Sequence, residues 1–535
     1  MTSNTEETEE TEETAIRGAG PRRSRRSAAD QPLDFRPLVL IGLVILTAVP
    51  VAVLVVPNTI SLAAAAAVRS LGVQPESASQ VVRVYGLALP ALMLTVPAAA
   101  VHARRTRPWP VLLTGLVVLG ATELLAGMVG SVFLLAVLRI FQGIGAGMVL
   151  PATLVLVTAL QRRGQRLLSA WYAGVLVVSL MAVTPMLYLA LLGDEWDDIM
   201  QPYPLLVAAA LVCTALLIIA ERPEGLPRAG TRESERILLL PVIPALGLSV
   251  FAFGASFNWA TWALLALAVT ALIVMYGLTT LGDAFDGRAG VNHAVVSVSA
   301  GVVVLPVTAQ IVNISLPGFG GPGLGQVWAP LAVAVLVTLA AAVAGNLGRP
   351  DSASKLVIAG LVAAGLGLLA VRLFMPASNW LVILSMALLG GGIGCAFGAS
   401  LRGISSGAGL LGLGLIFPAV LAGQLLSGAF MLRVTESIAQ GTLQPQYVHG
   451  VLLSALRSWV TVSALVLLVA IVDVSLASMR REGRRRRPRA AGSAAERTEA
   501  TGRTATERAE ATEHLERTET TEPTEGDEAS EADIR

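Results

Sequence analysis

Apolar segments of about twenty residues follow one another along most of the chain, separated by short polar connections. A helix of that length crosses the hydrocarbon core of a bilayer, so each segment predicts a transmembrane α-helix. About fourteen such spans are predicted. Their expected bounds are 37–57, 82–101, 109–129, 133–158, 168–192, 203–221, 236–254, 260–280, 292–314, 327–347, 354–375, 380–400, 405–431 and 452–476.

The overall composition agrees with this pattern. The 535 residues are 54% hydrophobic and have a mean hydropathy of +0.70, which is too apolar for a soluble core. The expected fold class is therefore an all-α polytopic membrane protein. A formal net charge of +1 argues against nucleic acid as a partner. Cys213 and Cys395 both fall inside apolar segments, where packing is a more common role than a disulfide or a metal site.

The connections alternate in charge. One group carries the acidic run 194–198 or the Gly/Pro-rich stretch 317–325. The other group is basic, and its arginines are Arg104, Arg105, Arg107, Arg162, Arg163, Arg166, Arg228, Arg232, Arg349 and Arg402. The positive-inside rule places the basic connections in the cytoplasm. Both termini are then cytoplasmic, because the predicted number of spans is even.

One charged tail is expected before the first span and another after the last span. Residues 1–36 combine a Thr/Glu-rich tract with a basic cluster, and residues 478–535 begin with arginines and continue as a Glu/Arg/Thr-rich tail. Both are too polar to build a core, so we expect disorder. The basic clusters beside the membrane are suited to contact with anionic lipid. Lys355 is the only lysine, an arginine bias typical of a high-GC bacterium, and the expected location is its plasma membrane.

Arg139 is the most informative residue because it stands in the middle of an apolar span. It is followed by Gln142 and by three small residues, Gly143, Gly145 and Gly147, with Pro151 further along the span. A guanidinium at bilayer depth faces a bundle interior or a wet cavity rather than lipid, unless it serves as a charge partner for a neighbouring helix. The glycines suit close helix packing.

The run 138–147 with Pro151 resembles the fourth-helix signature of the major facilitator superfamily, especially its fourteen-span drug:proton antiporter branch. The resemblance implies two six-helix halves, here 37–221 and 292–477, with a two-helix insert within 222–291. It also implies that Arg139 lies in the central cavity and takes part in proton transfer. Gln142 would then be a second polar group in that cavity, beside the packing glycines.

Other signatures of that family are eroded. The loop after the second span keeps Arg104 and Arg107, which the resemblance assigns to gating, but lacks the family's Asp and both glycines. The first span keeps only Pro57 of its motif, and the fifth span keeps Pro185 of a glycine-rich Gly-Pro motif. A standard proton-coupling carboxylate is missing. The resemblance therefore supports the fold better than the mechanism.

Glu123 is the carboxylate that could substitute. It lies about six residues from the outer end of the third span, and Arg139 lies about as far into the fourth span, so the two are expected at similar depth. Three roles remain open: a structural ion pair with Arg139, a proton-exchanging pair, or a side chain that snorkels to the outer surface. A weaker candidate pair, Gln310 and Asn313, either lines the second half of a cavity or bonds to a neighbouring helix.

Two functional hypotheses follow. The first is a secondary transporter that exports a small amphipathic or drug-like compound by alternating access, with a proton gradient as the energy source. The second is a degenerate transporter-like protein that acts as a scaffold or sensor. The sequence contains no nucleotide-binding loop and no grouping of residues typical of a metal or hydrolytic site, so we expect neither a cofactor nor an enzyme.

Overall fold

The computed structural model describes residues 35–56, 78–160, 162–190, 204–221, 231–254, 261–315, 325, 328–348, 352–375, 379–439, 449–476, 478 and 508. Within these ranges the chain forms helices joined by short turns. The charged tails predicted at 1–36 and 478–535 lie almost entirely outside the described residues. So do the acidic connection and nearly all of the Gly/Pro-rich stretch.

The first part of the chain forms six long helices and one short one. They are α1 (Phe35–Leu54), the short α3 (Ala78–Tyr85), α4 (Ala88–Arg105), α5 (Pro108–Ala126), α6 (Val132–Thr158), α7 (Arg162–Ala190) and α9 (Pro204–Glu221). Local signals set some of their starts. Ser131 caps α6 by accepting a hydrogen bond from the Leu134 backbone N–H at 3.2 Å, and Pro108 opens α5, where its missing N–H costs nothing.

The central segment forms α10 (Arg232–Leu239), α11 (Val242–Gly254), α12 (Thr261–Thr279) and the short α13 (Asp283–Asp286). The prediction of one continuous span over 236–254 was wrong. The helix breaks at Leu240 and Pro241, since proline has no N–H to donate and its ring clashes with the preceding turn.

The last part of the chain forms six more long helices. They are α14 (Arg288–Ser315), α15 (Trp328–Leu347), α16 (Ala353–Phe374), α17 (Asn379–Ser400), α18 (Ser406–Ala439) and a final helix, His449–Leu476. Their backbone groups bond within each helix, which is what a chain in hydrocarbon requires.

Eleven of the described helices are long and apolar enough to cross a membrane. A helix also occupies each of the other three predicted positions, in the form of α4, α9 and α11. These are less apolar or shorter: α4 carries His102, Arg104 and Arg105 in its last turn, and α11 has 13 residues. The protein is an all-helical, multi-pass membrane protein.

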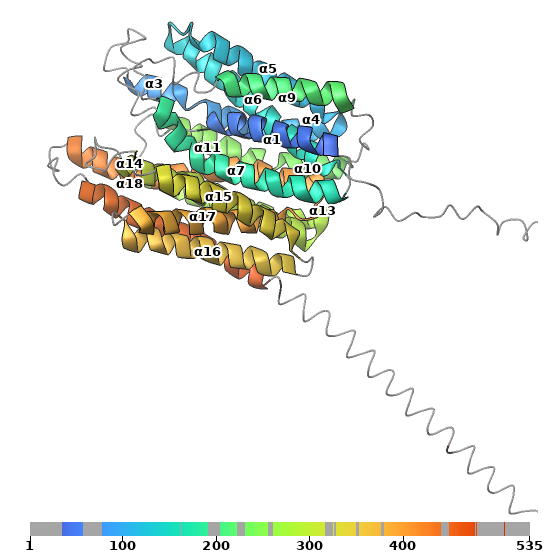
Figure 1. Cartoon of the computed structure of the whole chain (residues 1–535). Coiled ribbons are helices and arrows are strands. Elements are labelled where there is room, and N and C mark those ends of the chain that lie inside the picture. The colour runs from blue at the N-terminus through green and yellow to red at the C-terminus, as the bar shows by residue number, and fades with distance from the viewer. Residues whose placement is uncertain are drawn as a thin grey trace, which may run out of the picture.

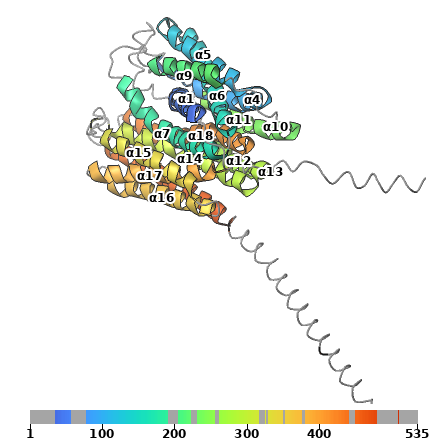
Figure 2. The ribbon, with the colours of Figure 1, turned by 45° about the vertical axis from the view of Figure 1, so that its right-hand side comes forward.

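The helix contacts repeat between the two parts of the chain. In the first set of six long helices, α6 packs against α1, α4 and α5, and α1 packs against α7. In the second set, α17 packs against α14, α15 and α16 in the same order, and α14 packs against α18. The two sets meet where α4 contacts α18 and where α7 contacts α15. Figures 1 and 2 show the first set (blue to green) above the second (yellow to orange). Helix α7 of the first set and helices α14 and α18 of the second lie where the two sets meet.

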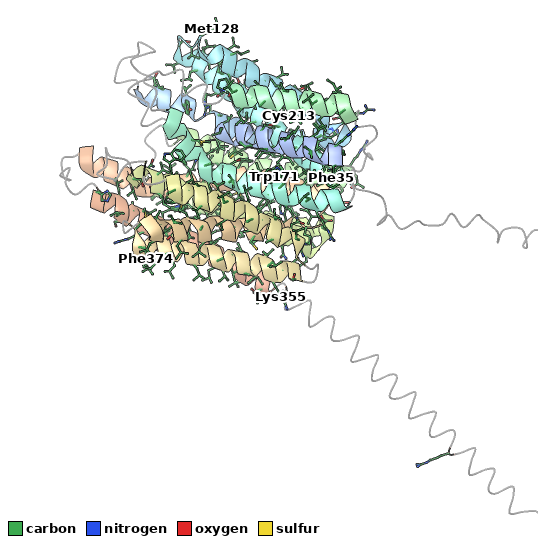
Figure 3. The ribbon with its side chains drawn as sticks, in the orientation of Figure 1. Phe35, Met128, Trp171, Cys213, Lys355 and Phe374 are labelled. Atoms are coloured by element: carbon green, nitrogen blue, oxygen red, sulfur yellow. The ribbon has the colours of Figure 1, made fainter. Side chains whose placement is uncertain are left out.

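Several basic side chains gather at one end of the bundle. Phe35 and Lys355, at the starts of α1 and α16, lie at one end, and Met128 and Phe374 lie at the other (Figure 3). Following the helices in order places a group of basic side chains at the first end, which we call the arginine-rich end; it comprises Arg104, Arg105, Arg166, Arg232 and Arg402.

Candidate functional site

Arg139 is buried and fully engaged by protein atoms. Its side chain is 4% exposed and donates from Nε to the Tyr85 carbonyl at 2.8 Å, and from one terminal nitrogen to Gln142 Oε1 at 2.8 Å. The other terminal nitrogen donates to the Val55 carbonyl at 3.1 Å. The guanidinium carbon also lies 3.8 Å from the centre of the Tyr85 ring, which is a cation–π contact.

The partners of Arg139 are the ends of two helices. Tyr85 is the last residue of α3, and Val55 directly follows the last residue of α1. Carbonyls in these positions have no partner within their own helix, and they carry the negative end of the helix dipole. Among the described residues, Arg139 is therefore compensated by two helix C-termini and not by a carboxylate. The contact fastens α1 and α3 to α6 at the end of the bundle opposite the arginine-rich end.

The glycines after Arg139 set how closely α6 approaches its neighbours. A Cβ on Gly143 would lie 2.1 Å from the Ala88 carbonyl oxygen, and one on Gly147 would lie 2.7 Å from Thr95 Cβ, so these two glycines face α4. Gly145 faces α5 instead, where a Cβ would lie 2.8 Å from the Gly115 carbonyl oxygen. Pro151 is buried further along the same helix. These three glycines allow close packing of α6 on both sides.

Glu123 does not pair with Arg139. Glu123 is 8% exposed, and no ion pair joins it to Arg139. Within the described part of the chain, its Oε2 atom has no hydrogen-bond partner. Of the three roles left open for Glu123, the ion pair with Arg139 is therefore not formed in this structure.

Glu123 and Arg139 lie at similar depth, as expected, but do not face each other. Gly115 faces Gly145 across the α5–α6 contact. Glu123 lies eight residues after Gly115. Because α5 and α6 are antiparallel, it lies at the height of the α6 residue eight positions before Gly145, which is within one turn of Arg139. However, Gly145 is six residues beyond Arg139, a rotation of about 240° at 100° per residue. Arg139 therefore points about 120° away from the face that meets α5.

The weaker candidate pair, Gln310 and Asn313, lies near the end of α14. Gly423 of α18 packs against Val302 and Pro306, and Gln310 is one helical turn beyond Pro306, so it lies on the stripe that faces α18. Gln310 is 7% exposed, and its Oε1 has no hydrogen-bond partner among the described residues. Asn313 is half-buried. The hydrogen bonds of Arg139 go to Tyr85, Gln142 and Val55 and to neither of these amides, so the predicted site residues do not form one cluster.

The remaining motif residues take different positions. Arg107 is exposed at the start of α5, Arg104 is half-buried in the last turn of α4, and Pro185 is buried inside α7. The neighbouring Arg105, which the motif comparison did not single out, forms an ion pair with Glu235 of α10. Arg105 is thus paired with an acidic residue of the central segment.

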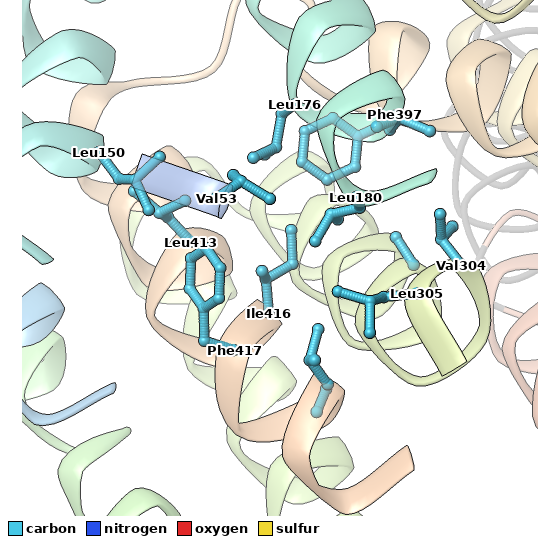
Figure 4. Packing of buried hydrophobic residues seen from close by; sticks show 14 of the residues in the cluster. Val53, Leu150, Leu176, Leu180, Val304, Leu305, Phe397, Leu413, Ile416 and Phe417 are labelled. Carbon is cyan, nitrogen blue, oxygen red and sulfur yellow. The ribbon is translucent and has the colours of Figure 1, made fainter. Parts of the chain in front are cut away.

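The middle of the molecule is apolar. Figure 4 shows Val53 of α1, Leu150 of α6, Leu180 of α7, Leu305 of α14 and Ile416 of α18 directed toward one another. Each of these side chains is buried. Because they come from both sets of helices, the contact between the sets consists of apolar side chains at this level, with the rings of Phe397 and Phe417 beside the aliphatic ones.

Nothing in the sequence singled out His293. The structure buries it within α14, with Nδ1 3.0 Å from Ser400 Oγ and its ring edge-on to Phe397. The role of Tyr85 was missed as well, since no local pattern marks a carbonyl at a helix end as an arginine partner. Over the residues that the structure describes, no group of three or more His, Cys, Asp or Glu side chains is placed to hold a metal ion.

The bundle has the fold of the major facilitator transporters. The human organic anion transporter MFSD10 (TETRAN) superposes with a TM-score of 0.52 at 13% identity, covering 83% of this chain and 100% of that chain. The proton:xylose symporter XylE gives 0.50 at 13% identity, covering 80% and 94%. An auto-inhibited peptide transporter of the POT family gives 0.50 at 14% identity, covering 81% and 96%. No protein-family model matches the sequence, and no curated protein matches it.

Proposed function

We propose that the protein is a secondary transporter that exports a small amphipathic compound by alternating access, in the manner of the fourteen-helix drug:proton antiporters. The observation that carries this proposal is the repeated helix packing. Two sets of six helices, which meet where α7 contacts α14, α15 and α17 and where α18 contacts α4 and α6, can rock about their common contact and open one end at a time. The fold likeness to an organic anion transporter and a proton:xylose symporter supports the same class.

The substrate class follows from the middle of the bundle. Leu180, Leu305 and Ile416 meet between the two sets, so a compound bound at this level contacts aliphatic side chains (Figure 4). A site with few fixed polar groups selects by shape and apolar area, and accepts a range of ligands. An amphipathic or drug-like molecule fits this lining better than a sugar or a free ion.

Glu123 is the proposed proton-exchanging group. It is a buried carboxyl with an oxygen that lacks a described partner, whereas the three donor groups of Arg139 are bonded to protein atoms. In this proposal Arg139 fastens the helix ends, and Glu123 binds and releases the proton. Glu123→Gln then abolishes stimulation by a pH gradient and leaves downhill exchange of substrate intact.

The scaffold or sensor hypothesis is the second candidate. Two observations favour it: the loss of family residues around Arg104 and Arg107, and the close aliphatic packing where the two sets meet. Proteoliposome uptake separates the two. We expect accumulation of one or more members of a panel of lipophilic cations, neutral drugs and anions when a pH gradient is imposed, and loss of accumulation when the gradient is collapsed. A complete lack of uptake across the panel would favour the scaffold.

The orientation in the membrane is also proposed. The arginine-rich end is cytoplasmic under the positive-inside rule, which puts both termini and the basic clusters against the anionic inner leaflet. Single cysteines at Arg163 and Asp197 test this with an impermeant thiol reagent on intact cells. We expect labelling at position 197 and protection at position 163, and the reverse result would invert the topology.

A further inference from the structure

Three buried polar side chains of the second set carry atoms that have no hydrogen-bond partner among the described residues. They are Gln310 of α14 and Trp459 and Ser463 of the final helix, which are 7%, 1% and 0% exposed. The atoms concerned are Gln310 Oε1, Trp459 Nε1 and Ser463 Oγ. Leaving a buried polar atom without a partner is costly, so these atoms point to a ligand that forms hydrogen bonds.

Tyr276 of α12 marks the place where α14 and the final helix meet. Its hydroxyl lies 3.1 Å from Ser299 Oγ of α14 and 3.5 Å from the Val466 carbonyl oxygen of the final helix. Ser299 and Val466 are therefore at the same height on these two helices. We call the line of contact between α14 and the final helix, beside Tyr276, the Tyr276 seam.

The three side chains lie along this seam. Gln310 comes eleven residues after Ser299, which is three turns with a rotation of about 20°, so the two share one side of α14. Ser463 and Trp459 come three and seven residues before Val466, the spacing of neighbours on one helix face. Because the helices from α14 to the final helix alternate in direction, the residues after Ser299 lie beside the residues before Val466.

The spacing along the seam fits single water molecules. At 1.5 Å per residue, Ser463, Trp459 and Gln310 stand about 4.5, 10.5 and 16.5 Å above the height of the Tyr276 hydroxyl. Successive groups are thus about 6 Å apart, close to the span of one water molecule that forms a hydrogen bond of about 2.8 Å on each side. Helical side chains lean toward the start of their own helix, so on these antiparallel helices Trp459 and Gln310 lean toward each other.

The hydrogen-bonding capacities of these groups also fit water. Ser299 and Thr308 donate to carbonyls of their own helix, as hydroxyls in membrane helices commonly do. Ser463 Oγ makes no such bond and can both donate and accept. The indole of Trp459 only donates, and Gln310 Oε1 only accepts. A ligand that satisfies all three must donate and accept, and water is the smallest molecule that does both.

We propose that the Tyr276 seam binds a short chain of water molecules that links Gln310, Trp459 and Ser463 to the Tyr276 hydroxyl. The site needs the central segment, because α12 contributes Tyr276 at its inner end. It is separate from the apolar contact between the two sets. Leu305, which faces that contact, comes six residues after Ser299, a rotation of about 240°, so the seam lies on another side of α14. The proposal does not depend on transport.

Hydroxyl-radical footprinting of the intact, detergent-solubilised protein tests the proposal without any variant. Radicals formed by pulsed radiolysis in water labelled with heavy oxygen react with side chains that touch bound water. We expect label at Trp459 and none at Tyr172 or Phe417, which are equally buried but bonded to a carbonyl or surrounded by apolar side chains. The protein unfolded in sodium dodecyl sulfate shows that label at Trp459 is detectable. An unlabelled Trp459 in the folded protein overturns the proposal.

A double variant separates a hydrated seam from a dry one. Gln310→Met with Ser463→Ala removes two polar groups with little change in shape. We expect loss of label from Trp459 and a lower melting temperature, because the bound water loses its partners. In a dry seam the same changes remove unpartnered polar atoms and raise the melting temperature. Ser454→Ala, on the exposed side of the same helix, is the matched control and should change neither readout. A raised melting temperature, or label at Trp459 that persists in the double variant, overturns the proposal.

Discussion

Arg139→Gln tests the contact that fastens the ends of α1 and α3 to α6. A glutamine amide nitrogen occupies the position of the arginine Nε, so the variant keeps the bond to the Tyr85 carbonyl. It is too short to reach the Val55 carbonyl, and it loses the bond to Gln142 and the stacking on the Tyr85 ring. The perturbation therefore releases the end of α1 while leaving α3 attached.

The magnitude follows from the lost contacts. Polar bonds between membrane helices average about 0.6 kcal/mol, so two give about 1.2 kcal/mol. Loss of a cation–π contact adds about 1 kcal/mol. We expect Arg139→Gln to lower the free energy of unfolding by about 2 kcal/mol. Arg139→Lys should cost less, because its ammonium keeps the charge at the two helix ends.

Unfolding in mixed detergent micelles measures these changes, and hydrogen exchange of α1 locates them. Gln142→Ala is the matched control, since it removes one bond and leaves both backbone contacts, for an expected loss of about 0.6 kcal/mol. Exchange in the last turn of α1 should accelerate in Arg139→Gln and not in Gln142→Ala. Equal stability of Arg139→Gln and the parent, or unchanged exchange in α1, would refute the assigned role of the guanidinium.

Three further outcomes are expected. Gly143→Ala should destabilise the detergent-solubilised protein by about 2–3 kcal/mol, because the added methyl would lie 2.1 Å from a backbone oxygen. Gly365→Ala, whose methyl would meet nothing within 4 Å, should be neutral or slightly stabilising. Equal effects of the two changes would contradict the close packing of α6 on α4. Glu123→Gln and Arg139→Gln should have additive effects on the free energy of unfolding, to within about 0.5 kcal/mol, since no ion pair joins the two residues. A larger coupling energy would indicate that they do form an ion pair. The Arg105–Glu235 ion pair should persist at neutral pH and be lost only as the pH falls through the lowered pKa of Glu235, because a depressed pKa keeps the carboxyl charged above it. Hydrogen exchange of α10 measures this loss, and faster exchange near neutral pH would point to another group.

The sequence determined the number and position of the helices more reliably than any other feature. Uninterrupted apolar length is a local property, so a helix stands at each of the fourteen predicted positions, although only eleven described helices meet the length and hydropathy of a span. The depth of Arg139 and Glu123 was also predictable, because the rise per residue of a helix is fixed. Pro241 marks the break between α10 and α11. A proline alone does not predict such a break, because α6 and α7 contain Pro151 and Pro185 in their interior.

The direction of each side chain was decided only by the tertiary structure. Helices that are apolar on all faces carry no polar stripe to orient them, so rotation about the axis is set by where glycines permit close approach between distant segments. Gly143 and Gly147 turn Arg139 toward α3 and away from Glu123. In the same way, the partner of Arg105 is a residue 130 positions away, and only the folded chain brings the two charges together.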